Sequence, residues 1–524
     1  MMKKILFALL TLLLLSSTAI AAPVDYARAR KVALSAFQMY DAEMAAMSNK
    51  AVETAARWDI VPVTADGIDN VYIFNVFGYN PIGSVVSRGF VVVSGDDIAS
   101  PVLAYSVEDT IPTIAMRSQN PYAFSHLQRF GQEIGAARAE GMEATAVVSR
   151  QWADIETGAA TERARAMIAA KGEYLNDNIP QLLGQMIWGQ GNPYNRRCPG
   201  GSVTGCVATA FGMIMNYWDY PEHGFGMHAY NGLDNPAAYP DWSYGEQYAD
   251  FEHTYYDWEH MEDYAYINSS DVVIDAISTL IYQIGVSLEM RYTPDASGCW
   301  SLPEYAIFDT SLHLVDKAYT IGADYRIPRH FGYKYSYAGM RDSIGNDSLW
   351  LTMLYHSLAE GKPIYYAGWA AADNEAGHSG TSGHGYIIDG YFSDATDSNY
   401  FHINWGWNGS YNGFFKLDAM RPGGSDFTKW HGAIIGLEPD TNYHGYDYTD
   451  IKPLSTANGA VVRGMQGFIS VRNVENQPVA VYDLTGRVVL RRSVSPESEF
   501  NVRVSPGFYA VKVGSAPAKK VMVY

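Results

Sequence analysis

The chain has 524 residues, of which 48% are hydrophobic and 18% charged, so it can bury a substantial core. This length predicts about three domains. The 56 acidic and 37 basic residues give a formal net charge of −19, which argues against a general binder of nucleic acids or anionic membranes. Three cysteines are too few for a disulfide framework and leave at least one thiol unpaired.

The N-terminus has the pattern of a secretory signal peptide. Lys3 and Lys4 precede an apolar run over residues 5–15, and Ala19-Ile20-Ala21 is an A-x-A cleavage pattern. The apolar run is about half of the ~20 residues that a spanning helix needs. We therefore predict a signal peptide at 1–21, export from the cytoplasm and no membrane span.

Residues 22–115 are predicted to form a small α+β unit. Alanine-rich helical spacing favours a helix over 26–47, and apolar runs predict strands at 70–77 and 88–94. Residues 116–175 are rich in Ala, Arg, Glu and Gln, with few large apolar side chains in their later part. This composition predicts one or two exposed helices and a linker.

Residues 176–440 contain most of the tryptophans, and the stretch 204–218 is apolar on every face, which predicts a buried helix. Residues 465–524 contain short alternating segments separated by turns, including a tight hairpin at 483–486. We therefore expect residues 441–524 to form a linker followed by a β-sandwich of about seven strands or fewer. Further elements expected in 176–440 are helices at 271–285 and 350–360 and strands at 363–369, 386–389 and 400–405, the last two flanking a polar turn at 393–397.

Cys206 follows a glycine at the expected start of the buried helix, which Ser202 or Thr204 can cap. A thiol at a helix N-terminus experiences the positive end of the helix dipole, which favours the nucleophilic thiolate. Packing in a core is the commoner role of a lone cysteine. The position on the first helical turn favours the nucleophile.

A thiolate nucleophile needs a base, and His384 lies between two glycines at the start of an apolar strand. A loop histidine without a role is the alternative. Residues equidistant from a hairpin turn face each other, so Asn404 is expected opposite His384 or one position away. The Asn404 amide oxygen would then hold the imidazole, and Trp405 or Trp407 would shield the pair.

Gln190 lies 16 residues before Cys206. Its side-chain amide and the backbone N–H of Cys206 could together form an oxyanion hole, although a solvated loop glutamine is the alternative. The chain order Cys206, His384, Asn404 is that of a papain-like peptidase.

Four stretches together resemble the streptopain family of papain-like cysteine peptidases, which includes interpain-type enzymes. They are QGNPYN from Gln190, TGCVATAFGMIMNYWDYP from Thr204, GHGYIIDG from Gly383 and FHINWGWNGSYNGFFKLDA from Phe401. The resemblance implies an α+β, papain-like two-lobed catalytic domain at 176–440 that cleaves proteins and peptides without a cofactor or metal.

The same resemblance implies roles for individual residues. Cys206 would be the nucleophile, His384 its base and Gln190 the oxyanion donor, while Asn404 and Trp405 would orient and cover the histidine. The polar turn at 393–399 lacks the spacing of a calcium loop, so a plain turn is expected.

Two other stretches carry further resemblances. RGFVVVSGDDIASPVLAYS from Arg88 is similar to the family propeptide, which implies an inhibitory prodomain at 22–115 and an activation region at 116–175. VYDLTGRVVLR from Val481, with the segments after it, resembles a type IX secretion sorting domain at 441–524. The chain would then be exported through the periplasm of a Gram-negative bacterium and be secreted or attached to the outer membrane. Its partners would be substrates, its own prodomain and the type IX machinery, and no nucleic acid.

Two other functions remain open. A papain-fold acyl transferase of the transglutaminase or amidase type would use the same residues, and a catalytically inactive surface protein would keep only the fold. Cys198 and Cys299 are additional to the streptococcal pattern, and their pairing stays open. The aromatic, acidic stretch at 225–265 would either flank the substrate cleft or form surface loops.

Overall fold

The computed structural model divides the chain into two compact units, Met1–Tyr443 and His444–Tyr524, and each is described by itself. The predicted signal peptide lies outside the described residues. Within the described part of the chain, no helix has the length and apolar character needed to cross a membrane. The structure describes residues 22–48, 55–112, 120–169, 177–231, 244–299, 301–302, 322–369, 383–419, 431–445, 454–455, 461–465, 468–472, 478–483, 486–492, 499–505, 507–515 and 518–523.

The N-terminal part of the first unit, residues 22–169, begins with helix α1 (Tyr26–Met47), whose first turn is capped by the Asp25 side chain. The helix buries the face that carries Val32, Phe37 and Tyr40. The predicted helix and the two predicted strands are confirmed, with small shifts at their ends. The antiparallel strands are β1 (Arg57–Val63), β2 (Val71–Tyr79), β3 (Val85–Ser94) and β4 (Val102–Ser106).

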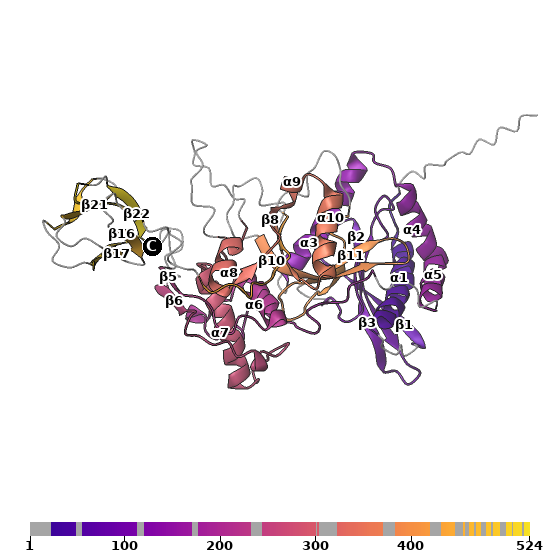
Figure 1. Cartoon of the computed structure of the whole chain (residues 1–524). Coiled ribbons are helices and arrows are strands. Elements are labelled where there is room, and N and C mark those ends of the chain that lie inside the picture. Colours follow the sequence, from indigo (N-terminus) through magenta and orange to yellow (C-terminus); the bar gives the residue numbers. More distant parts are fainter. Residues whose placement is uncertain are drawn as a thin grey trace, which may run out of the picture. The chain divides into compact units, whose positions relative to one another are not determined.

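Three helices follow, and the prediction of exposed helices with a linker is wrong for the first of them. Phe124, Leu127, Phe130 and Ile134 recur every three or four residues along that helix and are all buried. Helices α4 and α5 lie beside α1 (Figure 1). The bounds are α3 (Pro121–Ala139), α4 (Ala146–Thr157) and α5 (Ala159–Ala169).

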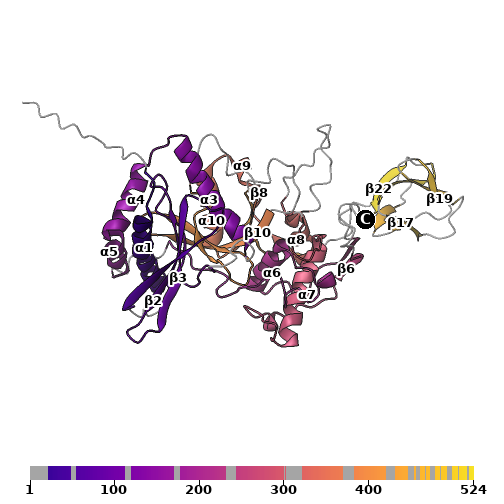
Figure 2. The same cartoon turned by 180° about the vertical axis from the view of Figure 1, so that it is seen from behind.

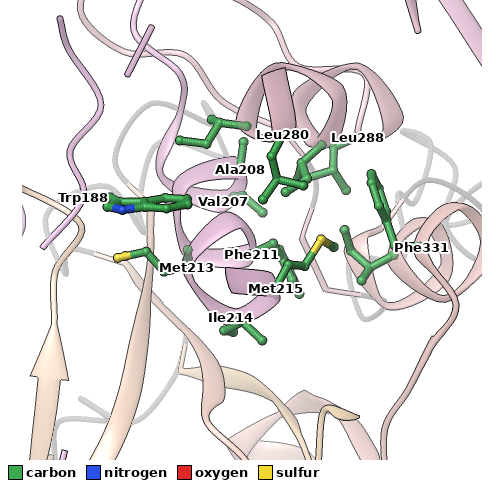
Figure 3. Packing of buried hydrophobic residues seen from close by; sticks show 14 of the residues in the cluster. Trp188, Val207, Ala208, Phe211, Met213, Ile214, Met215, Leu280, Leu288 and Phe331 are labelled. Atoms are coloured by element: carbon green, nitrogen blue, oxygen red, sulfur yellow. The ribbon is translucent and has the colours of Figure 1, made fainter. Parts of the chain in front are cut away.

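The central part, residues 177–443, contains the buried helix α6 (Cys206–Trp218) that the sequence predicts. Phe211 and Met215 pack with Leu280 and Phe331 in one apolar cluster (Figure 3). The expected helices at 271–285 and 350–360 are confirmed as α7 and α10. The other helical bounds are η2 (Pro199–Gly201), η4 (Trp258–His260), α7 (Asp271–Ser287), α8 (Ala323–Phe331), α9 (Arg341–Ile344) and α10 (Asp347–Ala359).

One antiparallel sheet of ten strands runs through both parts, in the order β1-β2-β3-β4-β12-β11-β10-β9-β13-β8. The junction pairs Tyr105 of β4 with Phe414 of β12. Helices α6–α8 gather at one end of the sheet (Figures 1 and 2), so the predicted α+β, two-lobed class is confirmed. The remaining strands are β5 (Met227–Asn231), β6 (Glu246–Asp250), β7 (Tyr333–Lys334), β8 (Tyr337–Met340), β9 (Ile364–Trp369), β10 (Gly383–Ser393), β11 (Asn399–Asn404), β12 (Gly413–Phe415), β13 (Gly432–Ile435) and β14 (Glu438–Pro439).

The register of the β10–β11 hairpin differs from the prediction. Asn404 pairs with Ile387, three residues from His384, so the expected pairing of Asn404 with His384 is wrong. The pair Ser393–Asn399 closes the hairpin, which centres its turn two residues later than assumed. That turn alone would place Asn404 opposite Ile388, and an irregularity between Ile388 and Gly390 moves the pairing back by one residue, to Ile387.

The second unit contains two four-stranded sheets around an apolar core that includes Val471, Val481 and Val511. Its described residues form eight strands, one more than expected, because a two-residue strand joins one sheet. Hydrogen bonds between Asp483 and both Gly486 and Arg487 confirm the predicted tight hairpin. The strands are β15 (Leu454–Ser455), β16 (Val461–Met465), β17 (Phe468–Arg472), β18 (Val479–Asp483), β19 (Val488–Arg492), β20 (Glu499–Arg503), β21 (Gly507–Val513) and β22 (Lys519–Val523).

Candidate active site

Cys206 is the first residue of α6, as the sequence predicts. The predicted capping by Ser202 or Thr204 is wrong, because Gly205 is the N-cap and no side chain caps the helix. Gly205 has a φ of 86°, and a Cβ there would lie 2.7 Å from the Met290 sulfur. This backbone conformation therefore favours glycine directly before the thiol, and a larger residue would also have to displace the end of the flexible Met290 side chain.

The Cys206 sulfur accepts a hydrogen bond from the backbone N–H of Gly385 at 3.3 Å. Burial raises the pKa of the thiol, while the N–H groups of Gly385 and Val207 act in the opposite direction. In this state burial outweighs the effect of the helix N-terminus that the sequence predicts, and the thiol form is favoured.

His384 directly precedes Gly385 in β10, so the sheet brings the imidazole next to the residue that contacts the thiol. The His384 Nε2 donates a hydrogen bond to the backbone carbonyl of Trp405 at 2.9 Å. Its Nδ1 is buried and has no hydrogen-bond partner among the described residues. Burial lowers the pKa of His384 to about 3, opposed by the Trp405 carbonyl. Cys206 and His384 are thus near one another, and both are in the neutral form.

The imidazole of His384 is covered by Tyr122, a residue that the sequence reasoning missed. The two rings lie parallel, with centroids 3.8 Å apart and an interplanar angle of 7°. Trp405 lies nearly parallel to the imidazole at 6.2 Å. The pair Asn120-Pro121 is a helix-start signal that predicts an ordered position for Tyr122, whereas the overall composition of residues 116–175 predicts exposed helices and a linker.

Asn404 does not hold the imidazole. Its amide donates to the Met186 carbonyl at 2.7 Å, and its oxygen accepts from the Gly406 N–H at 3.1 Å. The predicted orienting contact comes instead from the backbone carbonyl of Trp405. Asn404 anchors the turn that carries this carbonyl, so it acts on His384 only through the backbone of Trp405.

Gln190 is buried, and its side-chain nitrogen has no hydrogen-bond partner among the described residues. Its backbone carbonyl accepts from the Thr204 N–H at 3.0 Å, which ties the segment to the residues before Cys206. On the other side, Asn408 donates its backbone N–H to the Trp188 carbonyl at 3.2 Å. The backbone around Gln190 is therefore tied to the segments before Cys206 and after Trp407, while its side-chain nitrogen forms no hydrogen bond within the described residues.

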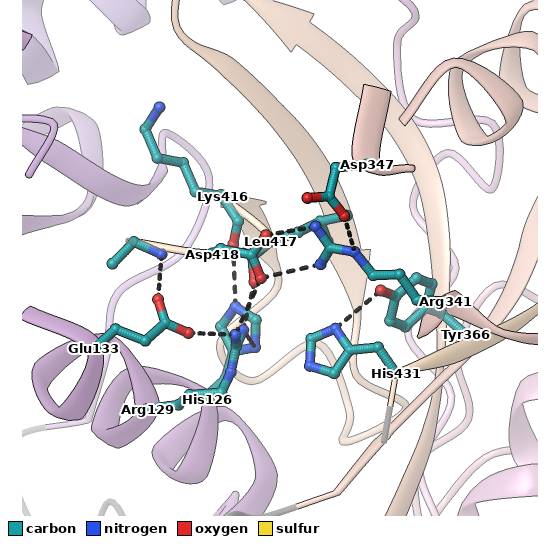
Figure 4. Close-up of polar contacts among 11 residues, drawn as sticks. His126, Arg129, Glu133, Arg341, Asp347, Tyr366, Lys416, Leu417, Asp418 and His431 are labelled. Carbon is teal, nitrogen blue, oxygen red and sulfur yellow. Dashed lines mark hydrogen bonds and ion pairs between the residues drawn. The ribbon is translucent and has the colours of Figure 1, made fainter. Parts of the chain in front are cut away.

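Helix α3 is anchored to the central part by four successive residues, 416–419 (Figure 4). The His126 Nε2 donates to the Lys416 carbonyl at 3.2 Å, and Arg129 donates to the Leu417 carbonyl at 2.5 Å. The Glu133 carboxylate accepts from the Ala419 N–H at 2.6 Å. Helix α3, which places Tyr122 over His384, is therefore hydrogen-bonded to the backbone that follows β12.

Charged side chains complete this contact. Arg129 pairs with Glu133 at 2.6 Å and with Asp418 at 3.3 Å, and Arg341 holds both oxygens of Asp418 at 3.0 and 2.7 Å. Arg129 and Arg341 are 6% and 3% exposed, so water screens these pairs little. Burial, followed by the charge of Arg129, lowers the pKa of His126 well below its usual value.

Among the described residues, no group of three or more His, Cys, Asp or Glu side chains is arranged to hold a metal ion. The three cysteines form no disulfide.

In the polar turn, the Asp394 carboxylate accepts hydrogen bonds from the N–H groups of Thr396 and Ser398 at 2.8 and 2.9 Å. The other Asp394 oxygen accepts a hydrogen bond from the Tyr40 hydroxyl at 3.0 Å, so this side chain ties the turn to α1.

Residues 188–415 match the family model of the Peptidase C10 family, and residues 21–134 match that of the Spi protease inhibitor. The second match extends into α3, beyond residue 115, where the sequence predicts the end of the prodomain. Together the two matches cover the described parts of the chain that contain Tyr122, Cys206 and His384.

Among characterised proteins, the chain is similar to the thiol protease/hemagglutinin PrtT of Porphyromonas gingivalis, with 26% identity over 454 residues. That match covers 84% of this chain and 45% of PrtT. Streptopain of Streptococcus pyogenes is 25% identical over 381 residues, covering 71% of this chain and 81% of streptopain. The chain thus spans less than half of the length of PrtT and most of streptopain.

Two solved structures from Prevotella intermedia also resemble the chain. A prointerpain A fragment is 23% identical with a TM-score of 0.47, covering 72% of this chain and 98% of the fragment. Active interpain A is 29% identical with a TM-score of 0.38, covering 50% of this chain and 95% of the enzyme.

Proposed function

We propose that the chain is a cysteine endopeptidase of the Peptidase C10 family, made as a zymogen, because residues 188–415 match the model of that family. One observation carries the proposal: the Cys206 thiol accepts a hydrogen bond from the backbone N–H of Gly385, the residue directly after His384. The buried Nδ1 of His384 has no hydrogen-bond partner among the described residues. A cysteine that only packs in a core needs neither a position at a helix N-terminus nor a histidine nearby from a distant strand.

In the proposed mechanism, His384 takes the proton of Cys206, and the thiolate attacks a peptide carbonyl carbon. The Gln190 amide and the Cys206 N–H stabilise the resulting oxyanion. The carbon–nitrogen bond then breaks as His384 gives its proton to the leaving amine. Water attacks the acyl-enzyme with His384 as base, which releases the acid and returns the proton to sulfur. Trp405 and Asn404 position the imidazole.

Latency follows from the N-terminal part, which acts as the prodomain. Tyr122 covers the imidazole, and burial keeps both the thiol and the imidazole neutral, so the reactive ion pair does not form. Cleavage that removes residues 22–169 would return water to His384. Its pKa would then rise towards its usual value, which favours the imidazolium and the thiolate.

The second unit supports a proposal about location. Its two small sheets and the stretch VYDLTGRVVLR from Val481 suit a type IX secretion sorting domain, and residues 1–21 suit a signal peptide. The enzyme would then pass through the periplasm to the outside of a Gram-negative cell. Deleting residues 444–524 should leave the proenzyme inside the cell if this proposal is right.

The test of function compares Cys206→Ala with Cys198→Ala in the intact chain. Cys198 is a buried cysteine outside the proposed catalytic group, so it controls for the loss of a thiol. We expect Cys206→Ala to abolish casein hydrolysis and self-processing, and Cys198→Ala to retain both. Full hydrolysis by Cys206→Ala would reject the proposal, and amine incorporation into casein without hydrolysis would favour an acyl transferase.

A further inference from the structure

The side chain of Tyr122 lies beside two aromatic side chains of the central part. Its side chain lies parallel to the imidazole of His384 at 3.8 Å and 6.1 Å from the indole ring of Trp407. Both contacted residues belong to the central part and remain there when the N-terminal part is removed. We call the position of the Tyr122 ring, bounded by His384 and Trp407, the ring site.

Hydrogen bonds of Asn120 fix the backbone that carries Tyr122, and so hold its ring against the imidazole of His384. The Asn120 oxygen accepts hydrogen bonds from the N–H groups of Tyr122 and Ala123 at 3.2 and 2.9 Å, which fixes the first turn of α3. The Asn120 amide donates to the Ser410 carbonyl at 3.3 Å, which ties this turn to the central part. Two sets of bonds thus place the Tyr122 ring against the imidazole.

The chemistry of the proposed reaction shows which part of a substrate meets the ring site. His384 gives its proton to the leaving amine, and that nitrogen belongs to the residue directly after the cleaved bond. This residue must therefore pass along the imidazole while the proton is transferred.

We propose that the ring site binds the side chain of the residue after the cleaved bond and selects aromatic side chains there. The inference rests on the proposed function and adds a substrate class to it. Parallel aromatic rings gain about 2- to 10-fold in binding beyond the area that they bury. Leucine has no ring, so it gains neither the stacking on His384 nor the tilted ring contact with Trp407.

The first experiment uses the processed enzyme and quenched fluorescent peptides that differ only in the residue after the cleaved bond. We expect kcat/KM for Tyr, Phe and Trp to exceed that for Leu by about 2- to 10-fold. In Trp407→Ala the ratio of ring to leucine substrates should fall towards 1. A ratio of 1 in the wild-type enzyme would overturn the inference while leaving the peptidase intact.

The second experiment needs no peptidase activity, so it separates this inference from the proposed function. In the unprocessed chain, the rate of iodoacetamide labelling at Cys206 is compared for Tyr122→Phe and Tyr122→Leu by mass spectrometry. We expect Phe to protect the thiol as Tyr does, and Leu to raise the labelling rate several-fold. Equal protection by Leu and Phe would show that the site does not distinguish rings, and would overturn the inference.

Discussion

Arg129 offers the sharpest test of how the prodomain is held. Its guanidinium is buried and bonds Glu133, Asp418 and the Leu417 carbonyl. Removing one partner of a buried ion pair costs about 3 to 5 kcal/mol. The lower end applies here, because Asp418 keeps Arg341 and Glu133 keeps the Ala419 N–H. We therefore predict that Arg129→Ala lowers the free energy of unfolding by about 3 kcal/mol, roughly a hundredfold in the equilibrium constant.

A matched control is the pair Arg150–Asp397, which also joins the N-terminal and central parts but whose side chains are 54% and 84% exposed. Arg150→Ala should cost less than about 1 kcal/mol. The assay is urea unfolding of the intact chain in a Cys206→Ala background, followed by tryptophan fluorescence. No tryptophan lies in residues 444–524, so the signal reports on the first unit alone. Equal, small effects of the two variants would refute the reasoning.

Three further predictions concern the site and its cover. Gln190→Ala in the processed enzyme should lower kcat by about 10²- to 10³-fold with little change in KM, because one oxyanion donor is lost; an unchanged kcat would exclude that role. Asn404→Ala should cost about 2 kcal/mol of stability for two lost hydrogen bonds and lower kcat, measured by thermal unfolding and peptide kinetics; full activity would remove Asn404 from the positioning group. The third prediction concerns His126, whose Nδ1 accepts a hydrogen bond from Arg129. A proton on Nδ1 would remove this acceptor and add a positive charge beside Arg129 and Arg341, although Glu133, Asp418 and His431 also lie near, so only neutral His126 fits. Docking lowers the pKa of His126 below 6.5, so α3 should be released as the pH falls below about 6.5. Hydrogen exchange in α3 should then rise in Cys206→Ala, and rise less in Cys206→Ala with His126→Gln.

The sequence predicts the elements whose pattern is strong and local. The all-apolar stretch after Cys206, the alanine-rich N-terminal helix and the hairpin at Asp483 are found where periodicity and turn residues place them. The position of Cys206 at a helix start next to the histidine strand could also be predicted, because glycines mark both sites.

The errors arise where long-range structure decides. The register of Asn404 depends on where the hairpin turn closes and on an irregularity in β10, and alternation reveals neither. The backbone carbonyl of Trp405 therefore makes the contact with His384 that was expected from the Asn404 side chain. The composition of residues 116–175 predicts that helix α3 is exposed, yet Arg129 and Glu133 are buried because they bond residues 417 and 419 of the central part. Tyr122 covers His384 only because α3 binds residues 416–419, a long-range contact that the sequence does not reveal.

The most direct test of the account is to react the processed protein with a thiol-directed epoxide and locate the label by mass spectrometry. We predict one label per chain, on Cys206, with labelling strongly slowed in His384→Ala and in the unprocessed chain. A label on Cys198 or Cys299 with Cys206 untouched, or no label at all, would contradict the claim that His384 activates Cys206.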